Sequence, residues 1–348
     1  MLKAQKNSYL QDILDEPAAL QRWLDSTISM DYASLHQIRA KLSSGKLRRV
    51  ILTGMGSSYH ALHSIWLPLL NQGISAVLLE TSELLHHAPV LCEPGSLLVV
   101  VSQSGRSAEV VRLLEQTDRN TTVIGVTNTA DSPLAQRAQV VLPLQAGAEF
   151  SVSCKTYVNT LGALALLAEL LTTADLQRTR KEILPVPEMI NAYLAQWQAH
   201  VAEAQESLAG IRYLILTGRG TSLAAAGTGG LTIKESAHFP TEGMSSAAFR
   251  HGPLEMASPE LFVLVFSGMG AGRRLNQKLV EDISAAGGKS ALVGASGNPG
   301  IFCLPQVAMS ALPLLEILPV QMVSLALAGL SGREAGLFSQ CSKLTDVE

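Results

Sequence analysis

One pattern of a strand, a glycine turn and a helix occurs in both halves of the chain. The segment RRVILTGMGSSYHAL begins at residue 48, and RYLILTGRGTSLAAA begins at residue 212. Aligning Ile51 with Ile215 gives an offset of 215 − 51 = 164 residues, and the apolar run from Leu97 matches the run from Leu261 at the same offset, 261 − 97 = 164. Two matches at one offset indicate that the chain contains a duplicated unit.

The order of patterns within each copy predicts the fold class. Each copy reads as a strand, a helix, a strand before SQSG or SGMG, a helix that begins near Ala108 or Arg273, and a further strand. Strands that alternate with helices form parallel sheets covered by helices. We therefore expect an α/β protein with two tandem three-layer αβα sandwiches and parallel sheets, preceded by a helical arm, SYLQDILDEPAALQRWL.

Two prolines mark the expected boundary between the copies. Pro185 and Pro187 interrupt two long helical patterns, one ending in TTADLQ and one beginning NAYLAQW. The 348 residues exceed the roughly 250–300 at which single hydrophobic cores usually divide. We expect the arm and the first domain in residues 1–183, and the second domain in residues 184–348.

Composition limits the classes of partner and the compartment. A content of 47% hydrophobic and 16% charged residues suits buried sheets and a large interface. The net charge of −3 supplies no basic field for nucleic acid or an anionic membrane. The cysteines lack metal-ligand spacing, and no signal-peptide pattern opens the sequence, so we expect a cytoplasmic protein without a metal site; these cysteines are Cys92, Cys154, Cys303 and Cys341.

Two polar turns follow strands of the first copy. They read Gly54-Met55-Gly56-Ser57-Ser58 and Ser102-Gln103-Ser104-Gly105-Arg106-Ser107. In open parallel sheets, ligands bind beyond the carboxyl ends of strands, where helix N-termini present N–H groups. Backbone amides and serine hydroxyls can hold a phosphate without a lysine. The turns therefore predict a phosphate site, with the alternative that the serines only cap helices.

The second copy serves as an internal comparison for these turns. At the offset of 164, residues 102–104 align with residues 266–268, which read Phe-Ser-Gly. This alignment indicates that the second copy has lost the serine cluster, which favours a single phosphate site in the first copy. A dinucleotide site is not expected, because Tyr59 and Leu223 stand where the third glycine of GxGxxG belongs.

The second copy carries candidate acid and base groups in LTIKESAHFPTEGMSSAAFRHGPLEM. Glu235 and His251 could form an acid/base pair for proton transfer beside a carbonyl, with Glu242 and Arg250 as further candidates at the substrate. The alternative is a solvated helix end and a capping histidine. Lys343, in the tail CSKLTDVE, reads by itself as a solvated terminal lysine.

The SQSG turn, the GxGSS turn and the duplication resemble the sugar isomerase (SIS) domain family, specifically the isomerase half of glucosamine-6-phosphate synthase and the fructosamine-6-phosphate deglycases. The resemblance covers essentially the whole chain, including the arm. It implies a set of residues that hold a sugar 6-phosphate, namely Gly56, Ser57, Ser58, Ser102, Gln103, Ser104 and Ser107.

The resemblance also implies catalytic roles. Glu235 would move a proton between C1 and C2, His251 would assist ring opening from a neighbouring subunit, and Lys343 would approach the sugar carbonyl. It therefore implies a homodimer or higher homo-oligomer with a shared active site, and no metal or organic cofactor.

Several positions depart from the family pattern. Thr232 and Ala248 stand where the synthase has a lysine and a glutamate, and Lys155-Thr156 reverses a Thr-Lys pair. The synthase's cysteine-dependent glutaminase domain has no counterpart in the sequence, so the chain is not expected to make ammonia from glutamine. We expect an enzyme that cleaves or rearranges the C–N bond of a fructosamine or amino-sugar 6-phosphate. The alternatives are an aldose–ketose isomerase, an amino-sugar 6-phosphate deaminase and a non-catalytic sugar-phosphate sensor.

Overall fold

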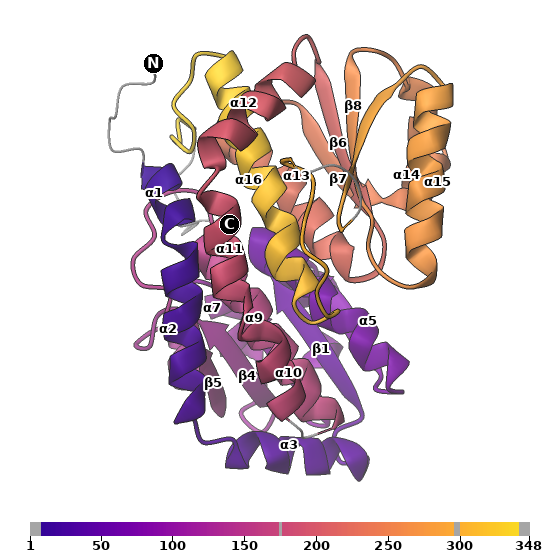
Figure 1. Cartoon of the computed structure of the whole chain (residues 1–348). Helices are drawn as coiled ribbons and strands as arrows, with labels where there is room; N and C mark the ends of the chain where they lie inside the picture. Colours follow the sequence, from indigo (N-terminus) through magenta and orange to yellow (C-terminus); the bar gives the residue numbers. More distant parts are fainter. Residues whose placement is uncertain (1–7, 174–175, 296–299, 341–348) are drawn as a thin grey trace. The chain divides into compact units, whose positions relative to one another are not determined.

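The computed structural model describes residues 8–173, 176–295 and 300–340, and it divides into two compact units (Figure 1). The five-stranded unit comprises residues 18–149 and 155–184, and the four-stranded unit comprises residues 8–17, 150–154 and 185–339. The expected fold class, two tandem αβα sandwiches with parallel sheets and helices at the N-terminus, is confirmed. Each unit includes segments distant in sequence, and the domain limits 1–183 and 184–348 stay a prediction.

The first sheet is wholly parallel and has the order β2-β1-β3-β4-β5. Its strands are nearly continuous runs of valine, leucine and isoleucine, as expected for strands buried on both faces. Their bounds are β1 Arg49–Gly54, β2 Ala76–Glu80, β3 Ser96–Val101, β4 Thr122–Thr127 and β5 Val140–Pro143.

Helices cover both faces of this sheet. Contacts join α9 to α3, α4, α5 and α10, while α6 contacts α7 and α7 contacts α8. The bounds of the helices are α2 Glu16–Ile28, α3 Ala33–Ser43, α4 Gly56–Ala61, α5 His63–Asn71, α6 Thr81–His87, η1 Pro89–Cys92, α7 Ala108–Gln116, α8 Pro133–Arg137, α9 Lys155–Thr172 and α10 Leu176–Ile183.

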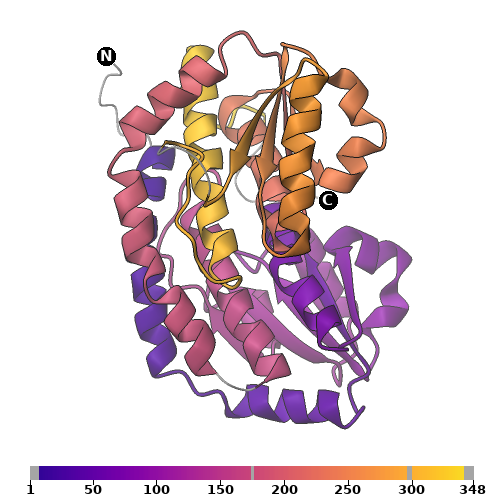
Figure 2. The same cartoon turned by 45° about the vertical axis from the view of Figure 1, so that its right-hand side comes forward.

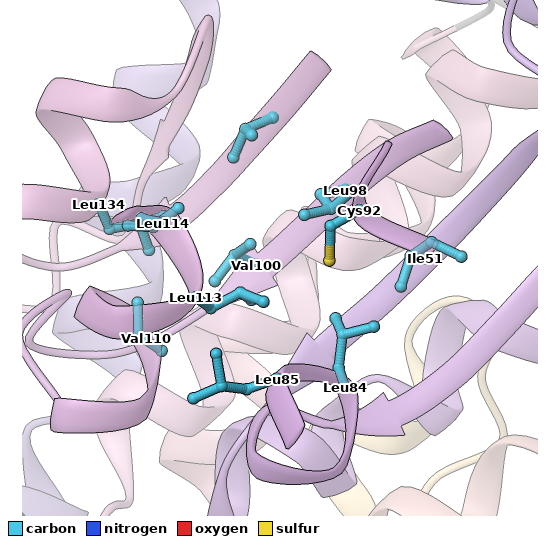
Figure 3. Close-up of a cluster of buried hydrophobic side chains, with 11 residues drawn as sticks. Ile51, Leu84, Leu85, Cys92, Leu98, Val100, Val110, Leu113, Leu114 and Leu134 are labelled. Atoms are coloured by element: carbon cyan, nitrogen blue, oxygen red, sulfur yellow. The ribbon is translucent and has the colours of Figure 1, made fainter. Parts of the chain in front are cut away.

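Figure 3 shows the core between this sheet and the helices α6, α7 and α8. Ile51 and Val100 of the strands face Leu84 of α6 and Leu113 of α7, and all four side chains are almost completely buried. Burying each such side chain stabilises the fold by about 1.5–3 kcal/mol. This packing fixes the positions of β1 and β3, the strands from which the polar turns continue.

The second sheet is also parallel, with the order β7-β6-β8-β9. Figures 1 and 2 show it in the salmon and orange part of the chain. The helix α13 packs on β6 and β7, and α14 and α15 pack on the opposite face around Phe249 and Leu279. The bounds in this unit are α1 Ser8–Leu14, α11 Val186–Leu194, α12 Trp197–Ser207, β6 Tyr213–Gly218, η2 Gly220–Ser222, α13 Leu223–Ala237, β7 Thr241–Ser245, α14 Ser246–Arg250, η3 Pro253–Met256, β8 Leu261–Phe266, α15 Ala271–Ala285, β9 Lys289–Val293 and α16 Leu312–Leu330.

The helix α16 is the most apolar helix of the four-stranded unit. It is long and apolar enough to cross a membrane, but 89% of its most apolar stretch of 18 residues is buried inside the structure. It packs against α11, α12 and α13. This burial is that of a core helix.

The strand registers correct the alignment of the two repeats. β1 and β6 begin at Arg49 and Tyr213, which are 164 residues apart, but these residues pair with Ser96 of β3 and Leu261 of β8, which are 165 apart. The segment between β6 and β7 is one residue longer than the segment between β1 and β2. Residue 102 is therefore equivalent to residue 267, and its predicted alignment with residue 266 is wrong.

Candidate functional site

The two polar turns lie beside the point where the strand order of the first sheet changes direction. β1 has β2 on one side and β3 on the other, and Gly54 at the end of β1 pairs with Val101 at the end of β3. Ligands of open α/β sheets bind at such a switch point, beyond the carboxyl ends of the strands. The structure places there all seven predicted phosphate residues: Gly56, Ser57 and Ser58 in α4, and Ser102, Gln103, Ser104 and Ser107 between β3 and the first turn of α7.

The serine at the start of α7 does not act as a side-chain cap. Ser107 occupies the N-cap position, but its hydroxyl makes no capping hydrogen bond. Elsewhere the same residue type does cap, since Ser132 accepts from Ala135 N in α8 and Ser245 accepts from Ala248 N in α14. The contrast weighs against the alternative that the serines of the turn serve only as helix caps.

Two other hydroxyls of the turn are oriented by its own backbone. Ser102 Oγ accepts from Gly105 N at 3.1 Å, and Ser104 Oγ accepts from Arg106 N at 3.1 Å. A hydroxyl that accepts one bond still has its hydrogen to donate. Gly105 has φ of +62° and lies against Ser132, so the turn requires a glycine there. The arrangement can therefore donate hydrogen bonds to an anion.

A third turn, residues 128–132 after β4, supports the second one, and sequence analysis missed it. Asn128 N donates to Gln103 O at 3.0 Å, and Thr127 Oγ1 donates to the same oxygen at 3.2 Å. These bonds fix the backbone of Gln103. The sequence signal for this turn is a strand followed by TNTADS, a segment without the glycines that mark the other two turns.

Aromatic and histidine rings follow the first turn along α4 and α5. Tyr59 lies 5.6 Å from His63, and His63 lies 6.2 Å from Trp66, measured between ring centroids and with edge-on geometry. Burial lowers the pKa of His63, which favours the neutral imidazole. Burial, together with the charge of Glu80, raises the pKa of Tyr59. The rings of Tyr59, His63 and Trp66 therefore form an uncharged cluster that follows the first polar turn.

The predicted acid/base residues lie in the four-stranded unit. Glu235 is half-buried in the last turn of α13. Because a crossover helix runs antiparallel to its strands, this turn lies at the amino edge of the second sheet, away from the switch point of that sheet. His251 is exposed at the C-terminal end of α14.

The two further candidates of this segment each have a charged partner. Lys234 Nζ lies 3.3 Å from Glu242 Oε2, and both side chains are largely exposed. Arg250 Nη2 lies 2.7 Å from Asp282 Oδ2, where the side chains are 31% and 27% exposed. Lys278 Nζ lies 3.1 Å from Asp282 Oδ1, and the hydrogen bonds from Arg250 and Lys278 lower the pKa of Asp282. The structure therefore shows surface ion pairs for Glu242 and Arg250.

Segments distant in sequence meet beside Glu235, which sequence analysis did not predict. Gly336 N donates to Ser236 O at 2.9 Å, and Ser151 Oγ donates to Gly336 O at 2.5 Å. Tyr9 of the arm packs against Gly336. Burial raises the pKa of Tyr9 well above its usual value, and the negative charge of Glu235 acts in the same direction. Tyr9 is therefore a neutral phenol close to Glu235.

A family comparison agrees with this geometry. The family model described as the SIS domain matches residues 45–170 and 207–298, which is more than half of the chain. The chain belongs to the SIS domain family. The two matched ranges contain the strands of both sheets, so each sheet represents one SIS domain. SIS domains bind sugar phosphates, which makes the chain an SIS-type phosphosugar protein.

The similarity to other proteins covers both SIS domains of this chain. The isomerizing glutamine–fructose-6-phosphate aminotransferase of Pyrococcus horikoshii is 27% identical over 363 residues, covering 99% of this chain and 59% of that protein. The chain thus spans about three fifths of the length of that relative. The C-terminal domain of the glucosamine–fructose-6-phosphate aminotransferase of Francisella tularensis matches with a TM-score of 0.79 and 20% identity, covering 97% of this chain and 99% of that one. The tagatose-6-phosphate ketose/aldose isomerase of Escherichia coli matches with a TM-score of 0.78 and 18% identity, covering 95% and 96%.

The second SIS domain has a carboxyl group at the turn that corresponds to the first polar turn. Ser222, which packs on Gly218 as Ser58 packs on Gly54, donates to Glu316 Oε1 at 2.7 Å. Glu316 is 1% exposed, and burial raises its pKa to about 8. The hydroxyl of Ser222 is thus hydrogen-bonded to a buried carboxyl group. This bond distinguishes the turn after β6 from the turn after β1 in the first SIS domain.

Two further expectations concern Lys343 and the absence of a metal site. Lys343 lies outside the described residues. Within residues 8–173, 176–295 and 300–340, no group of three or more His, Cys, Asp or Glu side chains could hold a metal ion.

Proposed function

We propose that the chain is an SIS-type enzyme that cleaves or rearranges the C–N bond of a fructosamine or amino-sugar 6-phosphate. The observation that carries the proposal is the pair of serine turns at the switch point of the five-stranded sheet. In the second turn, backbone N–H groups orient the hydroxyls of Ser102 and Ser104, whose hydrogens can then be donated to a ligand. A phosphate bound there anchors the substrate away from the reacting carbons.

The chemistry in this proposal follows the open-chain form of the sugar. His251 assists ring opening, and Glu235 moves a proton between C1 and C2 through an enol-type intermediate. Lys343 approaches the carbonyl, either to orient it or to form an imine. With a fructosamine substrate, water is the co-reactant and the products are a hexose 6-phosphate and a free amine.

Phosphorus-31 NMR of the purified protein with hexose, amino-sugar and fructosamine 6-phosphates tests the reaction without presuming a product. We expect a hexose 6-phosphate signal to grow from a fructosamine 6-phosphate. Growth from an amino sugar would instead identify a deaminase, and interconversion of hexose 6-phosphates an isomerase. Broadened ligand signals without conversion would identify a sensor and would overturn the enzymatic proposal.

The variant Glu235→Gln separates chemistry from binding. It is expected to bind the substrate within about threefold of wild type and to lose turnover by a factor on the order of 10³, because the amide cannot accept the proton. Glu255→Gln, at an exposed glutamate of η3, is the matched control and is expected to keep full activity. Equal turnover in Glu235→Gln and wild type would remove Glu235 from the mechanism.

We also propose a homodimer or larger homo-oligomer in which His251 acts on the neighbouring subunit's substrate. Its exposed position in the four-stranded unit is compatible with that role. Mixing the inactive variants Glu235→Gln and His251→Ala should restore part of the activity, since a hybrid assembly would contain an intact site. Activity that does not recover after verified subunit exchange would contradict a shared site.

A further inference from the structure

The positive charge at the three turns comes from one residue. Arg106 is the only lysine or arginine in residues 55–58, 102–107 and 128–132. The other donors of these turns are neutral hydroxyls, amides and backbone N–H groups. A phosphate monoester carries about −1.5 to −2 charge at pH 7. A cation within the turn is therefore the group best suited to distinguish a phosphate from a neutral ligand.

Arg106 is held by an exposed carboxylate of the third turn. Its Nη2 lies 3.2 Å from Asp131 Oδ1 and donates to Asp131 O at 3.2 Å. The two side chains are 43% and 83% exposed. Ion pairs as exposed as this one contribute little to stability. A phosphate offers the guanidinium a more highly charged acceptor that it can bind with two parallel hydrogen bonds, so the phosphate can displace Asp131.

Two hydrogen bonds hold the backbone around Arg106. Arg106 N donates to Ser104 Oγ, and the neighbouring Gly105 N donates to Ser102 Oγ. The guanidinium alone has to move, and its partial exposure leaves it room to rotate. Glu109, three residues after Arg106 in the first turn of α7, is only 7% exposed. Of these two carboxylates, Asp131 is therefore the one that solvent and ligand can reach.

We propose that Arg106 is a specificity-determining residue of the phosphate site, which pairs with Asp131 when no ligand is bound and with the phosphate when a sugar phosphate binds. This inference rests on the proposed phosphate site and names the selectivity of that site. It favours sugar phosphates with a doubly charged phosphate over neutral sugars. Asp131 acts only as the competing anion that Arg106 leaves.

Isothermal titration with fructose 6-phosphate, and with inorganic phosphate as a second probe, tests the exchange. Arg106→Gln should weaken binding about tenfold, as expected for the loss of one charge-assisted hydrogen bond. Asp131→Asn should tighten binding about threefold, because Arg106 no longer has to leave a carboxylate. The double variant should bind like Arg106→Gln, and Arg106→Lys, which keeps the charge without the fork, should lie between wild type and Arg106→Gln.

Arg119→Gln is the matched control for loss of one positive charge, since Arg119 is exposed in the connection that follows α7. Its binding should equal that of wild type within about twofold, and all variants should melt at the same temperature. Added KCl should weaken binding more steeply in wild type than in Arg106→Gln.

The outcomes separate this inference from the proposed function. If wild type binds the probes and Arg106→Gln binds them equally well, the role of Arg106 is wrong while the phosphate site stands. If Asp131→Asn weakens binding, the exchange of partners is wrong. If wild type binds neither probe, the phosphate site and the role of Arg106 are both overturned.

Discussion

Ser102 and Ser267 occupy the same position at the ends of the two central strands, β3 and β8. Ser102 N donates to Val126 O at 3.0 Å, and Ser267 N donates to Val293 O at 2.8 Å. Both serines are buried, with 7% and 4% exposure. Beyond this position the repeats differ, because the first continues Gln-Ser and the second Gly-Met. Of the residues in Ser102-Gln103-Ser104, only Ser104 therefore has a hydroxyl that the second repeat lacks.

Ser104→Ala and Ser267→Ala form a matched pair of variants. Ser104→Ala should weaken binding of fructose 6-phosphate about tenfold, because the proposed phosphate site loses one hydroxyl donor. Ser267→Ala removes a hydroxyl of the second repeat and should leave binding unchanged. Titration calorimetry measures both. Equal loss of affinity in the two variants would contradict a single phosphate site in the first repeat.

Glu316 should make stability depend on pH. Its folded pKa of about 8 lies above the usual 4.5, so the folded state keeps a proton that the unfolded state loses above pH 4.5. The stabilisation is therefore full below about pH 4.5 and decreases as the pH rises toward 8. Between pH 5 and 7.5 the free energy of unfolding should fall by up to about 3 kcal/mol.

The variant Glu316→Gln isolates this effect, because glutamine can still accept the hydrogen bond from Ser222 and does not titrate. Urea unfolding of both proteins at pH 5 and pH 7.5 gives the comparison. Wild type should lose more stability than Glu316→Gln over this interval. The same pH dependence in both proteins would show that Glu316 is not neutral in the folded state.

Gly336→Ala should impair both stability and turnover. Gly336 has φ of +80°, and an added methyl group would overlap Ser151 and Tyr9. Overpacking of this kind costs about 1–3 kcal/mol in addition to about 1 kcal/mol of backbone strain. Relief of this overlap would move Gly336 and, through its hydrogen bond, Ser236, the residue next to Glu235.

Gly332→Ala is the control for strain alone, since Gly332 has φ of +67° and no atom lies within 4 Å of the added methyl group. It should cost about 1 kcal/mol and leave turnover unchanged. Urea midpoints and steady-state rates separate the two variants. A Gly336→Ala protein as stable and active as Gly332→Ala would refute the close packing beside Glu235.

Tyr9→Phe tests whether the arm affects Glu235, the glutamate proposed to transfer the proton. The hydroxyl of Tyr9 bonds Ser324 Oγ at 3.1 Å, and its loss should cost about 1 kcal/mol of stability and reduce turnover several-fold. Tyr193→Phe removes a buried hydroxyl that donates to Ile301 O at 2.7 Å. It should cost similar stability and keep turnover. Equal rates in the two variants would exclude an effect through Glu235.

The sequence by itself determined the two repeats, the parallel α/β class and the turns at which a phosphate is expected. These features depend on local patterns: apolar strands, helical periodicity, and glycines and serines where strands end. Such patterns are read within some fifteen residues, and the observed β1, β3 and α7 agree with them.

Only the tertiary structure decided the register of the repeats and the surroundings of the site. The runs LLVVV and LFVLV are apolar throughout, so a shift of one residue leaves the match almost unchanged, and only hydrogen-bonded pairing with β1 and β6 distinguishes the two alignments. Packing likewise brings Tyr9 close to Glu235 and Asp131 close to Arg106. Contacts between segments far apart in sequence depend on how whole helices and strands pack, and no local pattern encodes them.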